Sequence, residues 1–194
     1  GEPPALLNTL LVLIGALLAH AAVNLLNEYE DFASGLDLIT RRTPFSGGSG
    51  ALPEVPTAAR QVLLAAFGTL GLVVAIGLYF LWLRGLPMLV LGAAGVVLVL
   101  TYTRWITRSP LICLLAPGLG FGPVMILGSL IALGARLDAT ALTVSTIGLL
   151  LVSELLLIKL PGALNRPEQF NTLLGINVGV LLATLALLIC GLSL

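Results

Sequence analysis

The sequence is poor in charged residues, which make up 9% of its 194 positions. An ordinary soluble domain carries about 25% charged residues, so this chain lacks the polar groups needed to cover a globular surface. Nine basic and nine acidic residues cancel to a formal net charge of zero, so the positive field that attracts nucleic acid is absent. These shortages exclude a soluble globular enzyme, and we expect no nucleic-acid partner.

Cysteine is also scarce. Cys113 and Cys190 are the only two, and each lies in an apolar run. They have neither the close spacing of a metal knuckle nor the density of a secreted disulfide scaffold. We interpret both as packing residues.

Apolar residues are abundant instead, at 58% of the chain. A helix of about 20 apolar residues crosses the hydrocarbon core of a bilayer, and breaks at Gly and Pro separate about six such segments. The sequence therefore predicts an all-α, polytopic transmembrane helix bundle that spans the lipid bilayer near 5–27, 60–83, 86–104, 110–134, 139–160 and 171–194.

The basic residues predict the orientation of the bundle. Because consecutive spans alternate in direction, the first, third and fifth connections share one membrane face, and they hold seven of the nine basic residues. The positive-inside rule makes that face cytoplasmic. Six of the nine acidic residues fall there too, so we expect any active site on the cytoplasmic face.

A polar stripe ends the first predicted span. On a helix, His20, Asn24, Asn27 or Glu28, and Asp31 share one face, and such a stripe facing lipid would cost several kcal/mol. It should therefore face the bundle interior or a wet cavity. Carboxylate and amide oxygens together suit a hard cation such as Mg²⁺, which binds through one or two carboxylates plus substrate phosphates. The alternatives are a solvated helix end for the acidic residues and a packing role for His20.

The segment after the stripe is rich in Gly, Ser and Arg, and runs through Arg41, Arg42 and Ser46 to Gly50. Backbone N–H groups of such a loop converge on anions, and arginines bind phosphate oxygens through forked hydrogen bonds. The segment predicts an anion pocket beside the metal site. A flexible connection with an arginine topology anchor is the alternative.

These motifs resemble a known family. Asn24-x-x-Asn27-Glu28-x-x-Asp31, then Ser34-Gly35-x-Asp37 and Arg41-Arg42-Thr-Pro-Phe-Ser-Gly-Gly-Ser-Gly, is similar to the first Asp-rich motif and following loop of the UbiA-type intramembrane prenyltransferases. The branch it resembles most is that of the 1,4-dihydroxy-2-naphthoate polyprenyltransferases of menaquinone biosynthesis. The resemblance implies Mg²⁺-dependent transfer of a polyprenyl group from its diphosphate to a small aromatic acceptor.

The resemblance also implies roles for individual residues. The expected catalytic residues are Asn24, Asn27, Asp31 and Arg42; the expected metal ligands are Asn27, Glu28 and Asp31; and the expected diphosphate-binding residues are Arg41, Arg42, Ser46 and Lys159. Further candidates are Asp37, His20 and the intramembrane carboxylate Glu154, which is a functional candidate by default.

The sequence departs from the family pattern in three ways. Position 28 is Glu where the family usually has Asp, the second Asp-rich motif expected after Leu155-Leu-Leu-Ile158 is absent, and about six spans stand where the family has about nine. We therefore expect residues 1–194 to be one transmembrane domain, incomplete at both ends and near 158/159.

Two other functions fit some of these features. An ion-coupled transporter also uses polar residues at broken helices, but it predicts an inverted repeat and polar groups at mid-membrane. A non-catalytic relative that kept the fold predicts no turnover.

Overall fold

A computed structural model describes residues 5–39, 49–102, 104–106, 109–135, 137–139, 142–143 and 146. Every regular element in these ranges is helical and none is a strand, which confirms the predicted all-α class. Four of the six predicted spans lie in the described residues. The fifth and sixth, at 139–160 and 171–194, lie almost entirely outside them.

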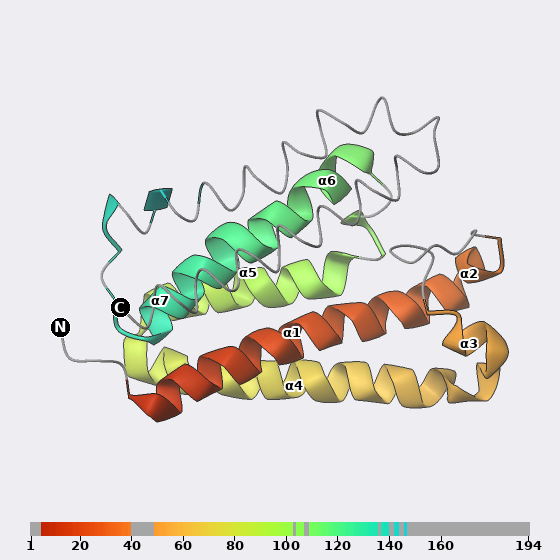
Figure 1. Cartoon of the computed structure of the whole chain (residues 1–194), viewed down its shortest axis with the longest axis horizontal. Coiled ribbons are helices and arrows are strands. Elements are labelled where there is room, and N and C mark those ends of the chain that lie inside the picture. Colours follow the sequence, from red (N-terminus) through yellow and green to blue (C-terminus); the bar gives the residue numbers. More distant parts are fainter. Residues whose placement is uncertain are drawn as a thin grey trace.

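The first two spans are α1 (Leu6–Ala33) and α4 (Ala59–Arg84), which pack side by side in opposite directions (Figure 1). Their contact is the most extensive between any two described elements. A Cβ atom at Gly15 of α1 would lie 3.5 Å from Ile76 Cγ2 of α4, so a small residue allows the two backbones to approach closely. The two helices are also linked by a hydrogen bond near the start of α1, where the Tyr79 hydroxyl of α4 donates to Asn8 Oδ1 at 3.0 Å.

α1 is longer than the sequence predicts. The apolar pattern ends near residue 27, whereas the helix continues to Ala33. Its 28 residues span about 42 Å, compared with a hydrocarbon core of about 30 Å. The polar last turns therefore project beyond the apolar layer as regular helix. The chain turns just after the helix at Gly35, whose φ of 76° is one that glycine adopts without strain.

The third span, α5 (Leu86–Tyr102), follows directly after Gly85. The fourth consists of α6 (Pro110–Leu119), the π-helical stretch η3 (Gly120–Leu127) and α7 (Gly128–Ala132). Pro117 and Pro123 lie inside it, and each proline removes one backbone N–H from the helical hydrogen-bond ladder. We attribute the π-helical geometry of Gly120–Leu127 to these prolines.

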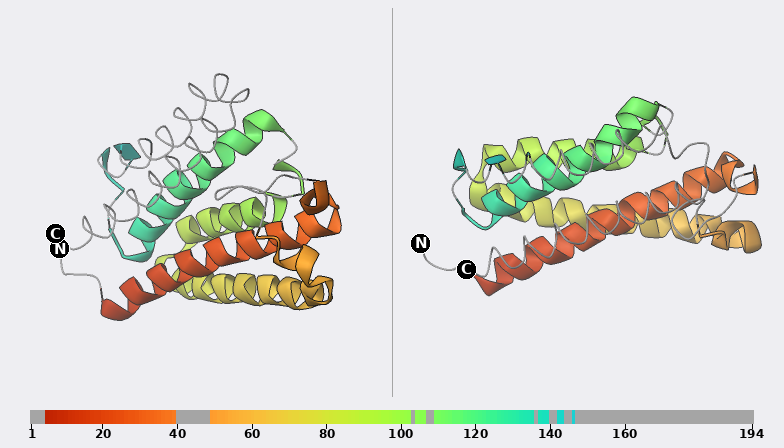
Figure 2. Two further views of the ribbon diagram at one scale, coloured as in Figure 1. Left: turned by 45° about the vertical axis from the view of Figure 1, so that its right-hand side comes forward. Right: turned by 45° about the horizontal axis from the view of Figure 1, so that its top comes forward.

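Glycines bring the third and fourth spans together. A Cβ atom at Gly95 of α5 would lie 3.3 Å from Val124 Cγ1, and one at Gly120 would lie 3.1 Å from Leu98 Cδ2. Figure 2 shows the fourth span beside α5, and α1 beside α4, in both views. The four spans therefore form one bundle in which α5 joins the α1–α4 pair to the fourth span.

The connections alternate between the two ends of the bundle, as predicted. The short elements α2 (Leu36–Ile39) and α3 (Ala51–Glu54) and the 310 turn η1 (Pro56–Ala58) connect α1 to α4 at one end, and residues 104–106 lie at that end too (Figure 1). At the other end, Arg84 Nε donates to the carbonyl oxygen of Ala132 at 2.9 Å. The first end is hereafter the acidic end, and the second is the far end.

The outer surface of the bundle is apolar. Leu17, Leu64 and Trp82 are each more than 60% exposed, although such side chains would ordinarily be buried in a soluble protein. Three described helices, Leu6–Ala33, Pro56–Arg84 and Leu115–Ala132, are long and apolar enough to cross a membrane, and Leu86–Tyr102 is a shorter apolar helix. The chain is an integral membrane protein.

Candidate active site

The extension of α1 places the polar motif on one continuous helix. Asn27 and Asp31 are four residues apart, and the Asn27 amide nitrogen donates to Asp31 Oδ2 at 3.0 Å. One turn later, the Ser34 hydroxyl donates to the backbone carbonyl of Asp31 at 3.1 Å. The half-buried Asp31 carboxylate is thus held in a fixed orientation at the acidic end.

Asp37 lies near Asp31 because the chain turns at Gly35. It sits in α2 and is only 6% exposed. The Asp31 carboxylate is repelled by the carboxylates of Asp37, Glu28 and Glu30. Four acidic side chains thus share a small region, and a bound cation would relieve their repulsion.

Glu28 points to a different partner from Asp31. Its Oε1 accepts a hydrogen bond of 2.6 Å from the Ser49 hydroxyl, and its Oε2 accepts one of 3.2 Å from the Ser49 backbone N–H. The structure therefore links the end of α1 to a residue that lies two positions before the start of α3. Spacing along the sequence gives no signal for this contact, which joins residues 21 positions apart.

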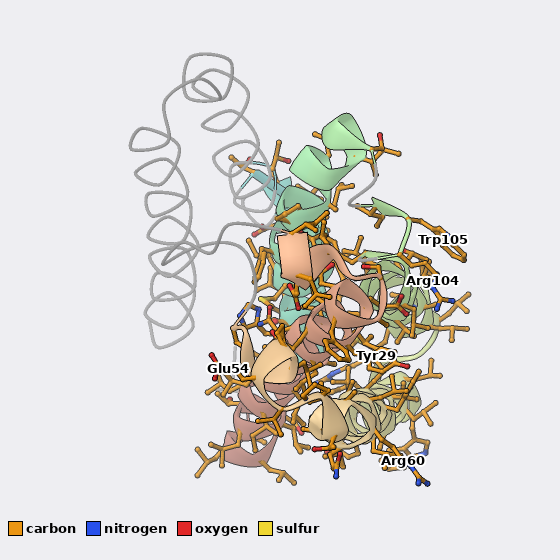
Figure 3. All side chains as sticks on the ribbon, turned by 90° about the vertical axis from the view of Figure 1, so that its right-hand side faces the viewer. Tyr29, Glu54, Arg60, Arg104 and Trp105 are labelled. Atoms are coloured by element: carbon orange, nitrogen blue, oxygen red, sulfur yellow. The ribbon has the colours of Figure 1, made fainter. Side chains whose placement is uncertain are left out.

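Glu30 forms an ion pair with Arg104, whose Nη2 lies 2.9 Å from Glu30 Oε1. Figure 3 looks onto this end, where Glu54 of α3, Tyr29 of α1 and Arg104 follow one another across the face. The positive-inside count placed Arg104 on this face but did not pair it. Its partner follows from the packing of α5 against α1.

The deeper part of the polar stripe lies beside the fourth span. The ring of His20 is tilted against that of Phe121 in η3, with the centroids 6.0 Å apart. His20 and Asn24 are both exposed rather than buried. The structure therefore separates the stripe into an exposed inner part, His20 and Asn24, and the paired outer part, Asn27 and Asp31.

The other predicted site residues lie outside the described residues. These are Arg41, Arg42, Ser46, Glu154 and Lys159.

The donor set at the acidic end has the chemistry of a magnesium site. Every candidate ligand atom is a carboxylate or amide oxygen, which is the type that Mg²⁺ prefers. Among the described residues, no group of three His, Cys, Asp or Glu side chains is close enough to hold a metal ion. Mg²⁺ commonly takes one or two carboxylates and completes its coordination with water and substrate phosphate. The residues present fit that arrangement, in which the ligand supplies part of the site.

Comparison with known proteins identifies the family of the chain. The sequence model of the UbiA prenyltransferase family matches residues 1–192, almost the whole chain. No curated protein and no solved structure matches it. The family match agrees with the apolar helix bundle, and it makes the chain a membrane prenyltransferase. The chain belongs to the UbiA prenyltransferase family.

Proposed function

We propose that this prenyltransferase moves a polyprenyl group from its diphosphate to a small aromatic acceptor, such as the quinone precursor 1,4-dihydroxy-2-naphthoate. The observation that supports it best is that three carboxylates, those of Asp37, Glu28 and Glu30, lie near the oriented Asp31, on the face where the sequence also places Arg41 and Arg42. This combination of negative and positive groups suits a cation and a diphosphate bound together. The positive-inside bias supports a cytoplasmic position for this site.

The proposed reaction needs charge stabilisation at one place. The bond between the first prenyl carbon and the diphosphate oxygen breaks, and its electron pair leaves with the diphosphate. A ring carbon of the acceptor then bonds to the allylic cation and loses its proton. A bound Mg²⁺ would supply positive charge next to the leaving group.

The residues of this chain have separate parts in the proposal. Asn27 and Asp31 supply oxygen ligands to the metal, with Asp37 as a neighbouring carboxylate. Arg41, Arg42, Ser46 and Lys159 bind the diphosphate, and the apolar spans hold the isoprenoid tail. Asn24 and His20 lie deeper on the same helix, with His20 beside Phe121, where they would meet the first isoprene units or the acceptor. Glu154 remains a further candidate.

Transfer of a radiolabelled prenyl group tests the proposal. The purified full-length protein is incubated with a polyprenyl diphosphate and a panel of aromatic acceptors, with Mg²⁺ or with EDTA. We expect Mg²⁺-dependent product that disappears in Asp31→Asn and persists in Asp138→Asn. Asp138 is an exposed aspartate at the far end, so it controls for the loss of one carboxylate.

The same assay separates the competing functions. No product with any acceptor, from a protein that remains helical, would refute the proposal. A non-catalytic relative would then be the better interpretation if the protein still binds prenyl diphosphate. Uptake of an ion by proteoliposomes would instead support a transporter.

A further inference from the structure

Glu28 stands apart from the rest of the acidic cluster by its contacts. Both of its carboxylate oxygens accept hydrogen bonds from one residue, Ser49, at 2.6 Å from the hydroxyl and 3.2 Å from the backbone N–H. Bonds to an ionised acceptor are stronger than neutral ones, and two parallel bonds also fix direction. Glu28 therefore fixes both the position and the orientation of Ser49 relative to α1.

Ser49 also contacts the first residue of α3. Its hydroxyl oxygen, besides donating to Glu28, accepts a hydrogen bond of 3.0 Å from the Ala51 N–H. Gly50, with φ of 74°, makes the turn that starts the helix, and Leu52 in its first turn is only 1% exposed. The contact with Glu28 thus joins the end of α1, through Ser49 and Gly50, to a buried side chain of the bundle.

The length of the Glu28 side chain matters for this contact. A carboxylate one methylene shorter would end about 1.5 Å nearer to the backbone, which is half the length of a hydrogen bond. Aspartate at position 28 would therefore keep the charge but fall short of Ser49. The family resemblance puts Asp at this position, and the contact with Ser49 gives the extra methylene a physical role.

We propose that Glu28 is a positioning residue, which holds Ser49 and the start of α3 against the end of α1, and that it is not a ligand of the metal. This inference rests on the proposed function, because the positioned chain follows the Arg41–Ser46 segment assigned to the diphosphate. It divides the acidic motif in two. Asn27 and Asp31 bind the metal, and Glu28 holds the connection between α1 and α4 in place.

Four variants test the division. Ser49→Ala removes the hydroxyl that donates to Glu28. Glu28→Asp keeps the negative charge but shortens the side chain, and Glu28→Ala removes the carboxylate altogether. Ser49→Thr keeps the hydroxyl and the backbone N–H, and so keeps both hydrogen-bond donors. We expect the first three to raise KM for the prenyl diphosphate about tenfold, since a lost bond to a charged group is worth about 1.5 kcal/mol. Glu28→Ala combined with Ser49→Ala should raise KM by less than the product of the two single effects, because both remove the bond from the Ser49 hydroxyl. Ser49→Thr should keep the wild-type KM.

A second measurement does not depend on turnover. Mn²⁺ replaces Mg²⁺, and its binding in the presence of prenyl diphosphate is followed by electron paramagnetic resonance. We expect the Mn²⁺ affinity of Glu28→Ala to stay within about twofold of wild type, whereas Asp31→Asn should lose it. The fall in the thermal midpoint of helix unfolding should be smaller in the double variant than the sum of the falls in Glu28→Ala and Ser49→Ala.

The outcomes distinguish the two proposals. A wild-type protein that makes no product refutes the proposed function, and the thermal midpoints still decide the Glu28–Ser49 coupling. An active wild type with a normal Ser49→Ala variant, together with a tenfold loss of Mn²⁺ affinity in Glu28→Ala, would overturn the positioning role and make Glu28 a metal ligand.

Discussion

Replacing Gly95 by Ala tests how closely the third and fourth spans pack. The added Cβ would lie 3.3 Å from Val124 Cγ1, and Val124 is β-branched, so its side chain has little rotamer freedom in a helix. Gly92 lies one turn earlier on the same helix and would meet nothing within 4 Å. Both substitutions remove a glycine from α5, so the gain in helix propensity of about 1 kcal/mol is common to them.

The difference between the two variants therefore isolates the contact. Overpacking of a well-packed interface costs about 1–3 kcal/mol, so we expect Gly95→Ala to be less stable than Gly92→Ala by about 2 kcal/mol. For a chain of this size that corresponds to a thermal midpoint lower by about 4–8 °C. Circular dichroism at 222 nm during heating in one detergent measures both variants.

A second substitution sharpens the test. Val124→Ala removes the methyl group that the new Cβ meets, so it should restore the midpoint of Gly95→Ala while lowering that of the wild type. Equal midpoints for Gly95→Ala and Gly92→Ala would show that the two spans are not in this close contact, and the reasoning would be wrong.

Three further predictions concern the two ends of the bundle. Asp31→Asn should lower prenyl transfer by about 100-fold or more, as expected when a group that organises transition-state charge is lost, while Asp138→Asn keeps the wild-type rate in the same assay. Arg104→Gln breaks an ion pair whose arginine is 60% exposed, so the free energy of unfolding should change by less than about 1 kcal/mol; a larger loss in thermal denaturation would show that the pair holds α5 to α1. Trp82 and Trp105 are 81% and 64% exposed at opposite ends and should sit at the two membrane interfaces. In the single-tryptophan variants, fluorescence should be quenched more by lipids brominated near the headgroup than by lipids brominated at the chain ends, and the reverse order would contradict this placement.

The sequence predicted the spans because hydropathy and helix length are linked by the thickness of the bilayer. The predicted 60–83 and the observed Ala59–Arg84 differ by one residue at each end. The predicted first span ends at 27, whereas α1 continues to Ala33 and carries the polar stripe through Asp31, which the sequence also places on this helix. Hydropathy reports where the apolar layer ends, whereas Asn27 to Ala33 remain helical beyond that layer.

The site was predicted in part. The i, i+4 spacing of Asn27 and Asp31 implied one helix face, and their hydrogen bond confirms that the two side chains meet. The Glu28–Ser49 contact joins residues on separate elements, and periodicity within one helix carries no information about it. Whether Asn27, Glu28 and Asp31 share a metal stays a prediction, as does the acceptor.

The two ends of the bundle are held together by different interactions. The acidic end carries exposed contacts of charged groups, Glu28 with Ser49 and Glu30 with Arg104, whereas the hydrogen bonds of the far end, Tyr79 with Asn8 and Arg84 with Ala132, are partly buried. Salt screens exposed charges but leaves buried packing unaffected. We therefore expect raised ionic strength to weaken the contacts of Glu28 and Glu30 at the acidic end, while the spans themselves stay packed against one another.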